Sequence, residues 1–321
     1  MPARVSRTAD LFRRFPTHNP SFKALLKQVQ AVLRLDVTVL LLGESGVGKG
    51  RMAEAIHALG HRRERPFVKI DCANLPGDLF ESELFGFEKG AFTDAKEAKP
   101  GKVEAAEGGT LYLDEVGSLP LPMQAKLLRV IEEKEFTRLG GHVPIRLDSR
   151  ILCSSNLDLQ ALVREGFFRK DLFYRINIMT FVLPPLRERR EDLPLLSLRM
   201  VRELAQQYRK PVRAIAQETH TILMRYPWRG NLRELHNVLE RAVIVCDDRR
   251  LQPEHLPSDA FLEEDLVQAA FAQKWDLERL EGAYIREILV FTRGNNTRAA
   301  RILGISRKTL IEKRKKYAIE R

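Results

Sequence analysis

The chain has 321 residues, of which 44% are apolar and 30% charged, a composition typical of a globular protein with two or three domains. Three widely separated cysteines without a CxxC pair argue against a zinc site or a disulfide framework and suit a reducing compartment. The longest apolar stretch, at 37–42, is too short to cross a bilayer, and the N-terminus has no apolar signal segment. We therefore expect a cytoplasmic protein that does not act at a membrane.

Short apolar runs alternate with amphipathic stretches from about residue 20 to residue 158. This alternation predicts an α/β domain in which a parallel sheet is covered by helices on both faces. The four expected strands are 37–42, 67–71, 110–114 and 150–154.

Composition and periodicity divide the chain into five segments. The first segment is short, polar and basic, and we expect it to be a disordered lead-in. A mostly helical stretch after the α/β core predicts a helical lid, and the segment rich in Asp, Glu and Pro that follows is the expected linker. The expected bounds are 1–18 for the lead-in, 19–188 for the core, 189–247 for the lid, 248–265 for the linker and 266–321 for a small all-α domain.

A glycine-rich loop follows the first expected strand and precedes a helical run at 51–58. Such a loop turns backbone N–H groups toward phosphates at a helix N-terminus, and its Lys49 would reach the β- and γ-phosphates of a nucleotide. The residue that usually offers a hydroxyl to Mg²⁺ is Gly50 here, so the match to the general motif is incomplete. The alternative is a glycine-rich turn with a chance lysine. The loop consists of Gly43, Glu44, Ser45, Gly46, Val47, Gly48, Lys49 and Gly50.

Two adjacent carboxylates, Asp114 and Glu115, end the third expected strand. At the carboxyl edge of a parallel sheet, Asp114 would hold Mg²⁺ and Glu115 would orient and deprotonate the water that attacks the γ-phosphate of ATP. The alternative is a strand that runs into an acidic turn. The phosphate loop about 65 residues upstream favours the catalytic interpretation.

Three further polar residues are candidates for the same chemistry. Asn156 follows the fourth strand and could touch the γ-phosphate or the attacking water, although an asparagine in this position is more often a turn residue. Arg169 and Arg175 lie six residues apart. Arginine supplies the positive charge that phosphoryl transfer needs, often from a neighbouring subunit. From composition alone, two surface arginines would be the simpler interpretation.

The C-terminal residues predict a DNA-binding helix-turn-helix. Residues 293–321 hold ten Lys or Arg residues against two acidic ones, and a chain of this charge is either a solvated surface or a phosphate-facing one. An amphipathic helix at 276–293 has Leu277, Leu280, Tyr284, Ile288 and Phe291 at helical spacing. Ala300, Leu303 and Ile305 are expected to pack around a glycine turn.

In this helix-turn-helix, Ser306 is the expected N-cap of the second helix, and Leu310 would attach that helix to the core. The start of the helix would read base edges, and the basic residues farther along would contact backbone phosphates. Readers of this kind usually bind two-fold DNA sites as dimers. The candidate DNA-binding residues are Thr297, Arg298, Ser306, Arg307, Lys308, Thr309, Lys313 and Arg314, and Lys316 is a further candidate for phosphates.

Taken together and in this order, these motifs resemble the bacterial enhancer-binding proteins, AAA+ activators of RNA polymerase that carries sigma-54. The resemblance runs from about Asn19 to the C-terminus and ends in a Fis-like helix-turn-helix. Its blocks are GESGVGKG, ESELFGFEKGAFTDA, GGTLYLDEVG, RILCSSNLDL, FRKDLFYRINI, LPPLRERREDLPLL and WRGNLRELHNVLERAV.

The resemblance implies roles for individual residues. Lys49, Asp114 and Glu115 match the phosphate lysine, the metal ligand and the catalytic acid, and Asn156 matches the first sensor. Arg233, within Gly230–Glu234, matches the second sensor, on a lid helix near the nucleotide. Arg169 and Arg175 match arginine fingers that act across a subunit boundary, which implies a homo-oligomer, from a dimer to a hexameric ring. Asp71 occupies the position that gates the catalytic glutamate, where the family usually has Asn.

The block at 90–95, Gly-Ala-Phe-Thr-Asp-Ala, matches the surface loop that pushes on sigma-54 in this family. The resemblance makes Phe92 and Thr93 the sigma-54 contacts. The alternative for Phe92 is a ring tucked back into the core. Asp94 replaces the usual glycine, which adds a negative charge and removes conformational freedom. Gly50 also differs from the family, which commonly has Glu there.

The resulting hypothesis is an ATP-hydrolysing activator that binds an upstream double-stranded DNA enhancer site and remodels the sigma-54 RNA polymerase holoenzyme. Because only about 18 residues precede the core, we expect the kind of activator that lacks an N-terminal regulatory domain and is controlled by a regulatory protein in trans or by expression level. The alternative is a DNA-binding regulator whose ATPase serves oligomerisation without sigma-54. A helicase or clamp-loader motor would share the ATPase motifs but leaves the loop at 90–95 and the DNA-binding end unexplained.

Overall fold

The computed structural model describes residues 7–74, 77–92, 95–257, 270–271, 274–292 and 294–319 of the chain. Contacts between residues divide the chain into two compact units. The first consists of Met1–Leu196 with Pro227–Leu235, and the second of Ser197–Tyr226 with His236–Arg321. Within the described residues, no helix is long and apolar enough to cross a membrane.

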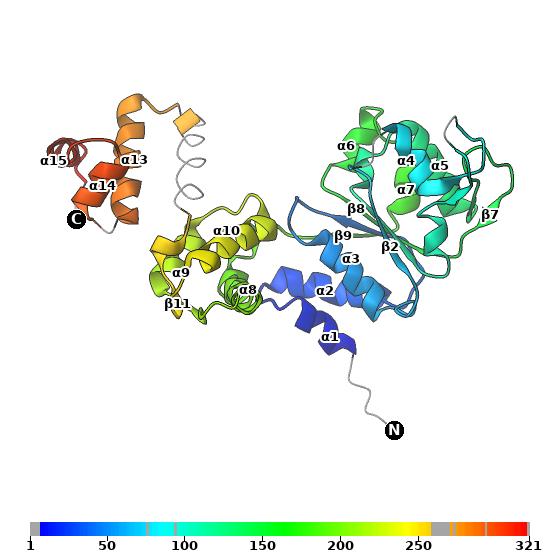
Figure 1. The fold of residues 1–321 in the computed structure, drawn as a ribbon, viewed down its shortest axis with the longest axis horizontal. Helices are drawn as coiled ribbons and strands as arrows, with labels where there is room; N and C mark the ends of the chain where they lie inside the picture. Colours follow the sequence, from blue (N-terminus) through cyan, green and yellow to red (C-terminus); the bar gives the residue numbers. More distant parts are fainter. Residues whose placement is uncertain are drawn as a thin grey trace, which may run out of the picture. The chain divides into compact units, whose positions relative to one another are not determined.

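The first unit is built on a five-stranded parallel sheet with the strand order β2-β5-β8-β1-β9 (Figure 1). Four of these strands are the predicted ones. The fifth strand, β9, was not predicted, because it is a half-exposed edge strand that buries only Phe181 and therefore lacks a long apolar run. The strands are β1 (Val39–Leu42), β2 (Phe67–Asp71), β5 (Thr110–Asp114), β8 (Arg150–Ser155) and β9 (Met179–Val182).

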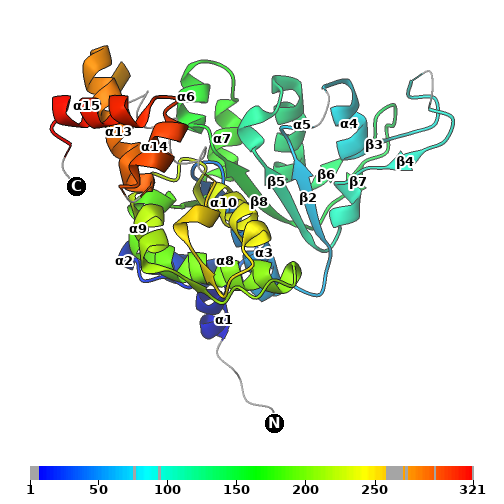
Figure 2. The ribbon, with the colours of Figure 1, turned by 60° about the vertical axis from the view of Figure 1, so that its left-hand side comes forward.

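Helices cover both faces of this sheet, as the alternating pattern predicted (Figures 1 and 2). Successive strand residues point to opposite faces, so Leu40 belongs to one buried cluster while Val39 and Leu41 belong to the other. One face carries α1 (Arg7–Arg14), α2 (Pro20–Val32) and α3 (Lys49–Leu59), and the other carries α4 (Gly77–Phe85), α5 (Leu121–Glu132), α6 (Leu159–Arg164) and α7 (Lys170–Ile176).

The expectation of a disordered lead-in over 1–18 is wrong for the described part of that segment. Residues 7–14 form α1, and Leu11 is fully buried in the cluster beneath the sheet. The segment is then fixed by Asp192, whose carboxylate accepts hydrogen bonds from the Thr17 hydroxyl and the His18 amide, both at 2.6 Å. The short polar sequence did not reveal these contacts because its partners lie far along the chain.

The segment expected to be a lid is helical, with α8 (Leu193–Gln207), α9 (Gln217–Arg225) and α10 (Asn231–Val245). The linker does not begin at residue 248, however. Residues 250–251 form β11, which pairs in parallel with β10 (Ala214–Ile215), and both Leu251 and Leu256 are buried. The Pro and Asp content of this stretch therefore marks turns within the lid. The remainder of the expected linker, 258–265, lies outside the described residues.

Two small hairpins project from the first unit, one formed by β3 (Gly86–Phe87) and β4 (Lys99–Pro100), the other by β6 (Glu135–Phe136) and β7 (Ile145–Arg146). They lie side by side in Figure 2, and backbone bonds link Glu88 with Leu139 at 3.0 Å and Leu139 with Gly86 at 2.9 Å. Short 3-10 turns complete the chain at Glu104–Ala106, Val116–Ser118, Leu186–Glu188, Arg190–Asp192 and Pro253–His255.

The C-terminal helices are α13 (Leu277–Phe291), α14 (Asn296–Ile302) and α15 (Arg307–Lys316). The buried face of α13 differs from the predicted one. Leu277 is 83% exposed and Tyr284 is 38% exposed. Ile288 is fully buried as predicted, and the helices pack around it with Ile285, Leu289, Ala299, Ala300 and Leu310. The prediction erred because two apolar stripes of similar quality run along α13 and the spacing alone does not choose between them.

Candidate functional site

The glycine-rich loop connects β1 to α3 at the carboxyl edge of the sheet. Gly46 and Gly48 have φ values of +78° and +105°, a left-handed conformation that side-chain-bearing residues rarely adopt. A Cβ atom on Gly46 would also lie 2.2 Å from the backbone oxygen of Gly230. The loop therefore requires glycine at this position for both conformation and space, which is the geometry expected of a phosphate cradle.

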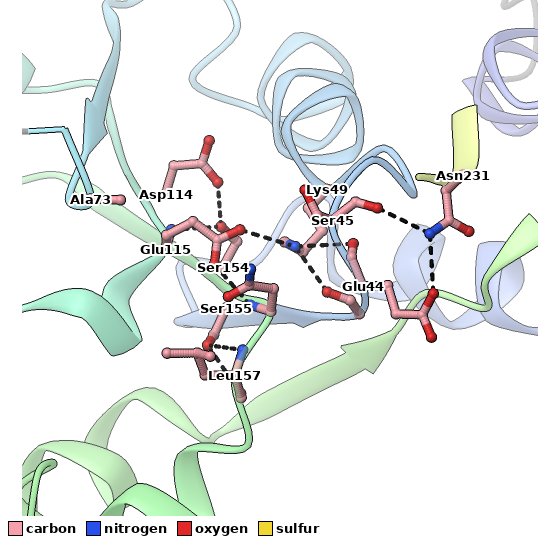
Figure 3. A network of polar contacts seen from close by, with 12 residues as sticks. Glu44, Ser45, Lys49, Ala73, Asp114, Glu115, Ser154, Ser155, Leu157 and Asn231 are labelled. Carbon is pink, nitrogen blue, oxygen red and sulfur yellow. Dashed lines mark hydrogen bonds and ion pairs between the residues drawn. The ribbon is translucent and has the colours of Figure 1, made fainter. Parts of the chain in front are cut away.

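Lys49, the first residue of α3, lies at the centre of this edge with its side chain 5% exposed. Its ammonium donates to the backbone oxygens of Gly43 at 2.8 Å and Glu44 at 3.2 Å, and lies 3.1 Å from Oε1 of Glu115 (Figure 3). These three oxygens hold the Lys49 ammonium in place. A bound phosphate would accept its hydrogen bonds in their stead.

Asp114 and Glu115 meet the same network from the end of β5, in agreement with the predicted neighbourhood. Oδ1 of Asp114 accepts hydrogen bonds from the hydroxyls of Tyr112 at 2.7 Å and Ser154 at 2.5 Å, and its Oδ2 lies 2.7 Å from Nζ of Lys69. Burial raises the pKa of Asp114, but the hydrogen bonds from Lys69, Ser154 and Tyr112 outweigh it and hold the net pKa below its usual value. Asp114 is therefore a carboxylate near neutral pH.

Glu115 is fixed by the next strand. Its backbone has a left-handed φ of 57°, its amide donates to the Ser154 hydroxyl at 3.1 Å, and its Oε2 accepts from the Asn156 amide at 2.8 Å. Ser154, fully buried in β8, thus links the Asp114 carboxylate to the backbone amide of Glu115, a role that sequence analysis missed. A serine directly after the apolar run of β8 was the signal for it.

Asn156 and Asp71 lie at this edge in different ways. The backbone amide of Asn156 donates to the Glu115 carboxylate, and Asn156 is an exposed residue. Asp71 stands opposite Asp114 in the β2–β5 register, but its carboxylate accepts from the Ala73 amide at 3.1 Å and the Asn74 side chain at 2.8 Å. No contact in the described residues joins Asp71 to Glu115.

Residues 230–234 pack directly on the phosphate loop, although they are almost 190 positions away in the sequence. Arg233 donates to the Ser45 hydroxyl at 2.9 Å, which places this predicted site residue at the loop. Asn231 is fully buried, unlike the exposed Arg233, and donates to the Ser45 backbone oxygen at 3.0 Å and to the Glu44 carboxylate at 3.1 Å (Figure 3). Asn231 was not predicted, and its left-handed φ of 55° is a strained conformation that only the structure reveals.

Glu44 is also held by an arginine that sequence analysis missed. Both terminal nitrogens of Arg187 donate to its two carboxylate oxygens, one of them at 2.7 Å and the other at 2.5 Å. These hydrogen bonds hold the pKa of Glu44 below its usual value. The bidentate pair fixes the start of the loop, and the arginine-rich segment at 187–190 was the available signal.

Arg169 and Arg175 stand at the two ends of α7, both exposed. Arg169 pairs with Asp171 at 2.7 Å, and among the described residues neither arginine contacts Lys49, Asp114 or Glu115. Arg169, Lys170, Asp171 and Tyr174 line an open pocket of 490 Å³. The two arginines are thus available on the surface rather than part of the site of their own chain.

The loop with the block at 90–95 rises from the β3–β4 hairpin. Phe92 is 41% exposed, and its ring packs edge-on against Phe87 with centroids 4.9 Å apart. The ring therefore rests on the hairpin and is not tucked into the core. Backbone bonds from Gly90 to Ala95 at 2.8 Å and from Ala95 to Phe92 at 3.0 Å close the loop. The predicted contact Thr93 and the unusual Asp94 lie outside the described residues.

The helix-turn-helix has the predicted N-cap at Ser306, and Asn295 supplies a second cap that was not predicted. The Ser306 hydroxyl accepts from the Thr309 amide at 3.0 Å, and Leu310 is fully buried. Asn295 caps the preceding helix by accepting from the amides of Thr297 and Arg298, both at 3.1 Å. Thr297, Arg298, Arg307 and Lys308 are exposed at the starts of the two helices, while Thr309 is half-buried.

Three basic residues later in α15 have partners within the domain. Lys313 lies 2.6 Å from the Glu281 carboxylate, Lys316 pairs with Glu278, and Arg314 donates to the Asn296 side chain at 2.8 Å. These lysines and Arg314 were predicted as phosphate contacts. The acids of α13 that engage the lysines were not considered in that prediction, and they partly neutralise this end of the helix.

The three cysteines are free and buried. Burial raises the pKa of Cys153 to about 12 and also raises that of Cys72. Thiols held neutral in this way are poor nucleophiles and poor metal ligands. No group of three metal-binding side chains occurs in the described part of the chain.

Fold and site together define a phosphate-loop α/β domain with a helical lid and a helix-turn-helix. Three family models match the chain in that order. They are described as "Sigma-54 interaction domain" over residues 15–182, "AAA+ ATPase lid domain" over residues 187–270, and "Bacterial regulatory protein, Fis family" over residues 276–317. The chain belongs to the sigma-54 interaction family of AAA+ ATPases.

Curated relatives agree with this assignment. The chain is 44% identical over 301 residues to the alginate biosynthesis transcriptional regulatory protein AlgB of Pseudomonas syringae pv. tomato, which covers 94% of this chain and 66% of the relative. It is 42% identical to the regulatory protein AtoC of Escherichia coli, with 95% and 68% covered. The chain thus spans about two thirds of the length of the relatives it matches.

Solved structures show the same fold. NtrX from Brucella abortus in complex with ATP matches with a TM-score of 0.69 at 32% identity over 97% of this chain and 71% of the other. The Hsp104 closed state, at 19% identity and a TM-score of 0.55 over 74% of this chain and 46% of the other, shares the fold alone.

Proposed function

We propose that this protein is an ATP-driven activator of sigma-54 transcription that acts from DNA in the bacterial cytoplasm. The observation that carries the proposal is the position of Lys49 between the carbonyl oxygens of the phosphate loop and Glu115, at the carboxyl edge of a parallel sheet. Nucleotides bind at this edge in α/β folds of this type. The family match over residues 15–182 supports RNA polymerase carrying sigma-54 as the target of the ATPase.

ATP would lie against the loop, with Lys49 donating to its β- and γ-phosphates and Arg233 reaching it beside Ser45. The donor set fits Mg²⁺, because Asp114 is an ionised carboxylate and Mg²⁺ needs only one or two such ligands when phosphates complete its shell. When bound, the metal ion would neutralise phosphate charge.

Glu115 would orient and deprotonate the attacking water, and the exposed Asn156 would hold that water or the γ-phosphate. Arg169 and Arg175 do not reach the site of their own chain, so they would act on the nucleotide of a neighbouring subunit in a homo-oligomeric ring. Asp71 would influence Glu115 only after it releases the Ala73 and Asn74 donors that it engages here.

Phe92 would contact sigma-54, with Thr93 beside it. An aromatic ring that rests half-exposed on a hairpin is a suitable anchor for a transient contact. The loop is also bonded to the neighbouring hairpin through Glu88 and Leu139, which gives hydrolysis a route by which to move it.

The helix-turn-helix would hold the assembly at an upstream double-stranded DNA site. Arg307 and Lys308 begin α15 in exposed positions, where side chains of such domains read base edges. Thr297, Arg298 and Arg314 would contact backbone phosphates nearby, and Lys313 would do so only by giving up its bond to Glu281.

The deciding experiment is transcription from a sigma-54 promoter with purified polymerase and ATP, comparing the wild type with Glu115→Gln. Activation that requires both ATP and Glu115 would establish the activator. ATP hydrolysis without any activation would refute the sigma-54 part of the proposal and leave a DNA-bound ATPase.

A second candidate is a DNA-binding regulator whose ATPase serves assembly without sigma-54. The feature that favours it is Asp94, which stands where the family's loop usually has glycine. If Asp94→Gly creates no sigma-54 dependence and the wild type has none, this second candidate is supported.

A further inference from the structure

A second lysine, Lys69, lies at the nucleotide edge and is not explained by the roles above. It projects from β2 beside Tyr112, and its ammonium lies 2.7 Å from Oδ2 of Asp114 and 5.8 Å from the centroid of the Tyr112 ring. Its side chain is 47% exposed, so solvent and ligands reach it, whereas the Asp114 side chain is 18% exposed.

Lys69 forms an ion pair with Asp114, the carboxylate that we propose as the metal ligand. The other oxygen of Asp114 already accepts two hydroxyl hydrogen bonds, from Tyr112 and Ser154. A divalent ion would therefore have to bind Oδ2, where it would meet the Lys69 ammonium. Two cations on one oxygen repel each other strongly in a partly buried site, so Lys69 and the metal ion exclude each other there.

The space next to Lys69 is open because residue 50 is glycine. A Cβ atom on Gly50 would have Nζ of Lys69 as its nearest neighbour, at 3.9 Å. Gly50 lies in the first turn of α3, directly after Lys49, and its φ is not left-handed, so the backbone does not require glycine. The glycine therefore removes a side chain from the path between Lys69 and the nucleotide phosphates.

We propose that Lys69 is a resident cation of the phosphate site. It neutralises Asp114 when no divalent ion is bound and turns to the nucleotide phosphates through the space beside Gly50, which makes nucleotide binding less dependent on Mg²⁺. The pairing at this edge supports it: Lys49 is matched by Glu115 and Lys69 by Asp114, so both carboxylates are neutralised without a metal ion. This inference rests on the proposed nucleotide site.

The test is the affinity of the full chain for a fluorescent ADP analogue, measured once with excess Mg²⁺ and once with EDTA. The quantity compared is the dissociation constant in EDTA divided by the dissociation constant in Mg²⁺. Lys69→Met keeps the length of the side chain and removes its charge, and we expect it to raise the ratio by about tenfold or more, chiefly by weakening binding in EDTA. Lys69→Arg keeps a cation and should leave the ratio close to that of the wild type.

Lys99→Met is the matched control, since Lys99 is similarly exposed, pairs with Glu83 at 3.0 Å and lies away from the phosphate loop. An unchanged ratio in Lys69→Met, including an equal loss of affinity in both buffers, would overturn the proposal and make Lys69 an ordinary exposed ion pair. A wild type that binds the analogue in neither buffer would instead refute the proposed nucleotide site itself.

Discussion

Two of the lysine–carboxylate pairs in this molecule, Lys49 with Glu115 and Lys313 with Glu281, have different surroundings. At the carboxyl edge of the sheet, Lys49 is 5% exposed and held by Glu115 and two backbone oxygens. In the C-terminal domain, Lys313 pairs with Glu281 on the surface, outside a small apolar core. Burial makes an unpaired charge costly, so the first pair is fixed and specific, while the second can exchange its partner for a phosphate at little cost.

The largest expected effect is at the buried pair. Glu115→Gln should lower the rate of ATP hydrolysis by about 10²–10⁴-fold, because a general base is removed while the shape of the side chain is kept. Nucleotide binding should stay within a few-fold of the wild type. The measurement is steady-state phosphate release, together with the affinity for a fluorescent nucleotide. Glu83→Gln, at an exposed pair with Lys99, is the control. Hydrolysis at more than half the wild-type rate would contradict the role of Glu115.

The second prediction concerns the apolar core on which the exposed pairs rest. Leu310→Ala should destabilise the helix-turn-helix by about 2–5 kcal/mol, because Leu310 is fully buried in a cluster of six residues that cannot easily close the cavity. Hydrogen exchange of residues 277–319 in the full chain measures this loss. Ile311→Ala, on the exposed side of the same helix, should change it little. Equal effects of the two variants would show that this core is not what holds the domain together.

The third prediction compares two cations of α15. Arg307→Ala should weaken DNA binding by about 1–3 kcal/mol, because Arg307 is exposed at the helix start where bases are read. Lys313→Ala should cost less, since its phosphate contact requires loss of the bond to Glu281. Fluorescence anisotropy with DNA fragments selected by the wild type from a random library, at several salt concentrations, measures both. A larger loss for Lys313→Ala would reverse the assignment of reading and pairing residues.

The smallest expected effect is the pH dependence of folding stability. It distinguishes the α/β core, which contains the buried His57, from residues 274–319, which contain no histidine. His57 is buried, its Nδ1 lies 2.9 Å from the Thr110 hydroxyl, and burial, with a contribution from Arg150, lowers its pKa below 6.5. Below pH 6.5 His57 binds a proton in the unfolded chain but not in the folded chain. Its contribution to the free energy of unfolding is therefore fully present above pH 6.5 and falls as the pH drops toward the pKa of the folded state. The slope is at most about 1.4 kcal/mol per pH unit.

Urea unfolding at pH 7.5 and at pH 5.5 tests this pH dependence. The difference in unfolding free energy between the two pH values should shrink in His57→Gln and persist in His61→Gln, because His61 is half-exposed and pairs with Asp36 at the surface. A difference that is the same in the wild type and in His57→Gln would assign the acid sensitivity to other groups.

The sequence determined the elements whose function depends on local order. The glycine-rich loop could be placed because a strand, left-handed glycines and a helix start must follow one another within a dozen residues, and Asp114 and Glu115 because they end a buried strand. The cap at Ser306 is local for the same reason. The predicted sites at these places could therefore be found without coordinates.

Only the tertiary structure decided how distant residues meet. It brought Asn231 and Arg233 onto Ser45, folded residues 7–14 into a helix, selected the buried stripe of α13 and paired Lys313 with Glu281. It also placed Lys69 between Asp114 and the open space at Gly50. Contacts of this kind depend on packing between elements that are far apart along the chain, and the periodicity of any one element does not specify its partner.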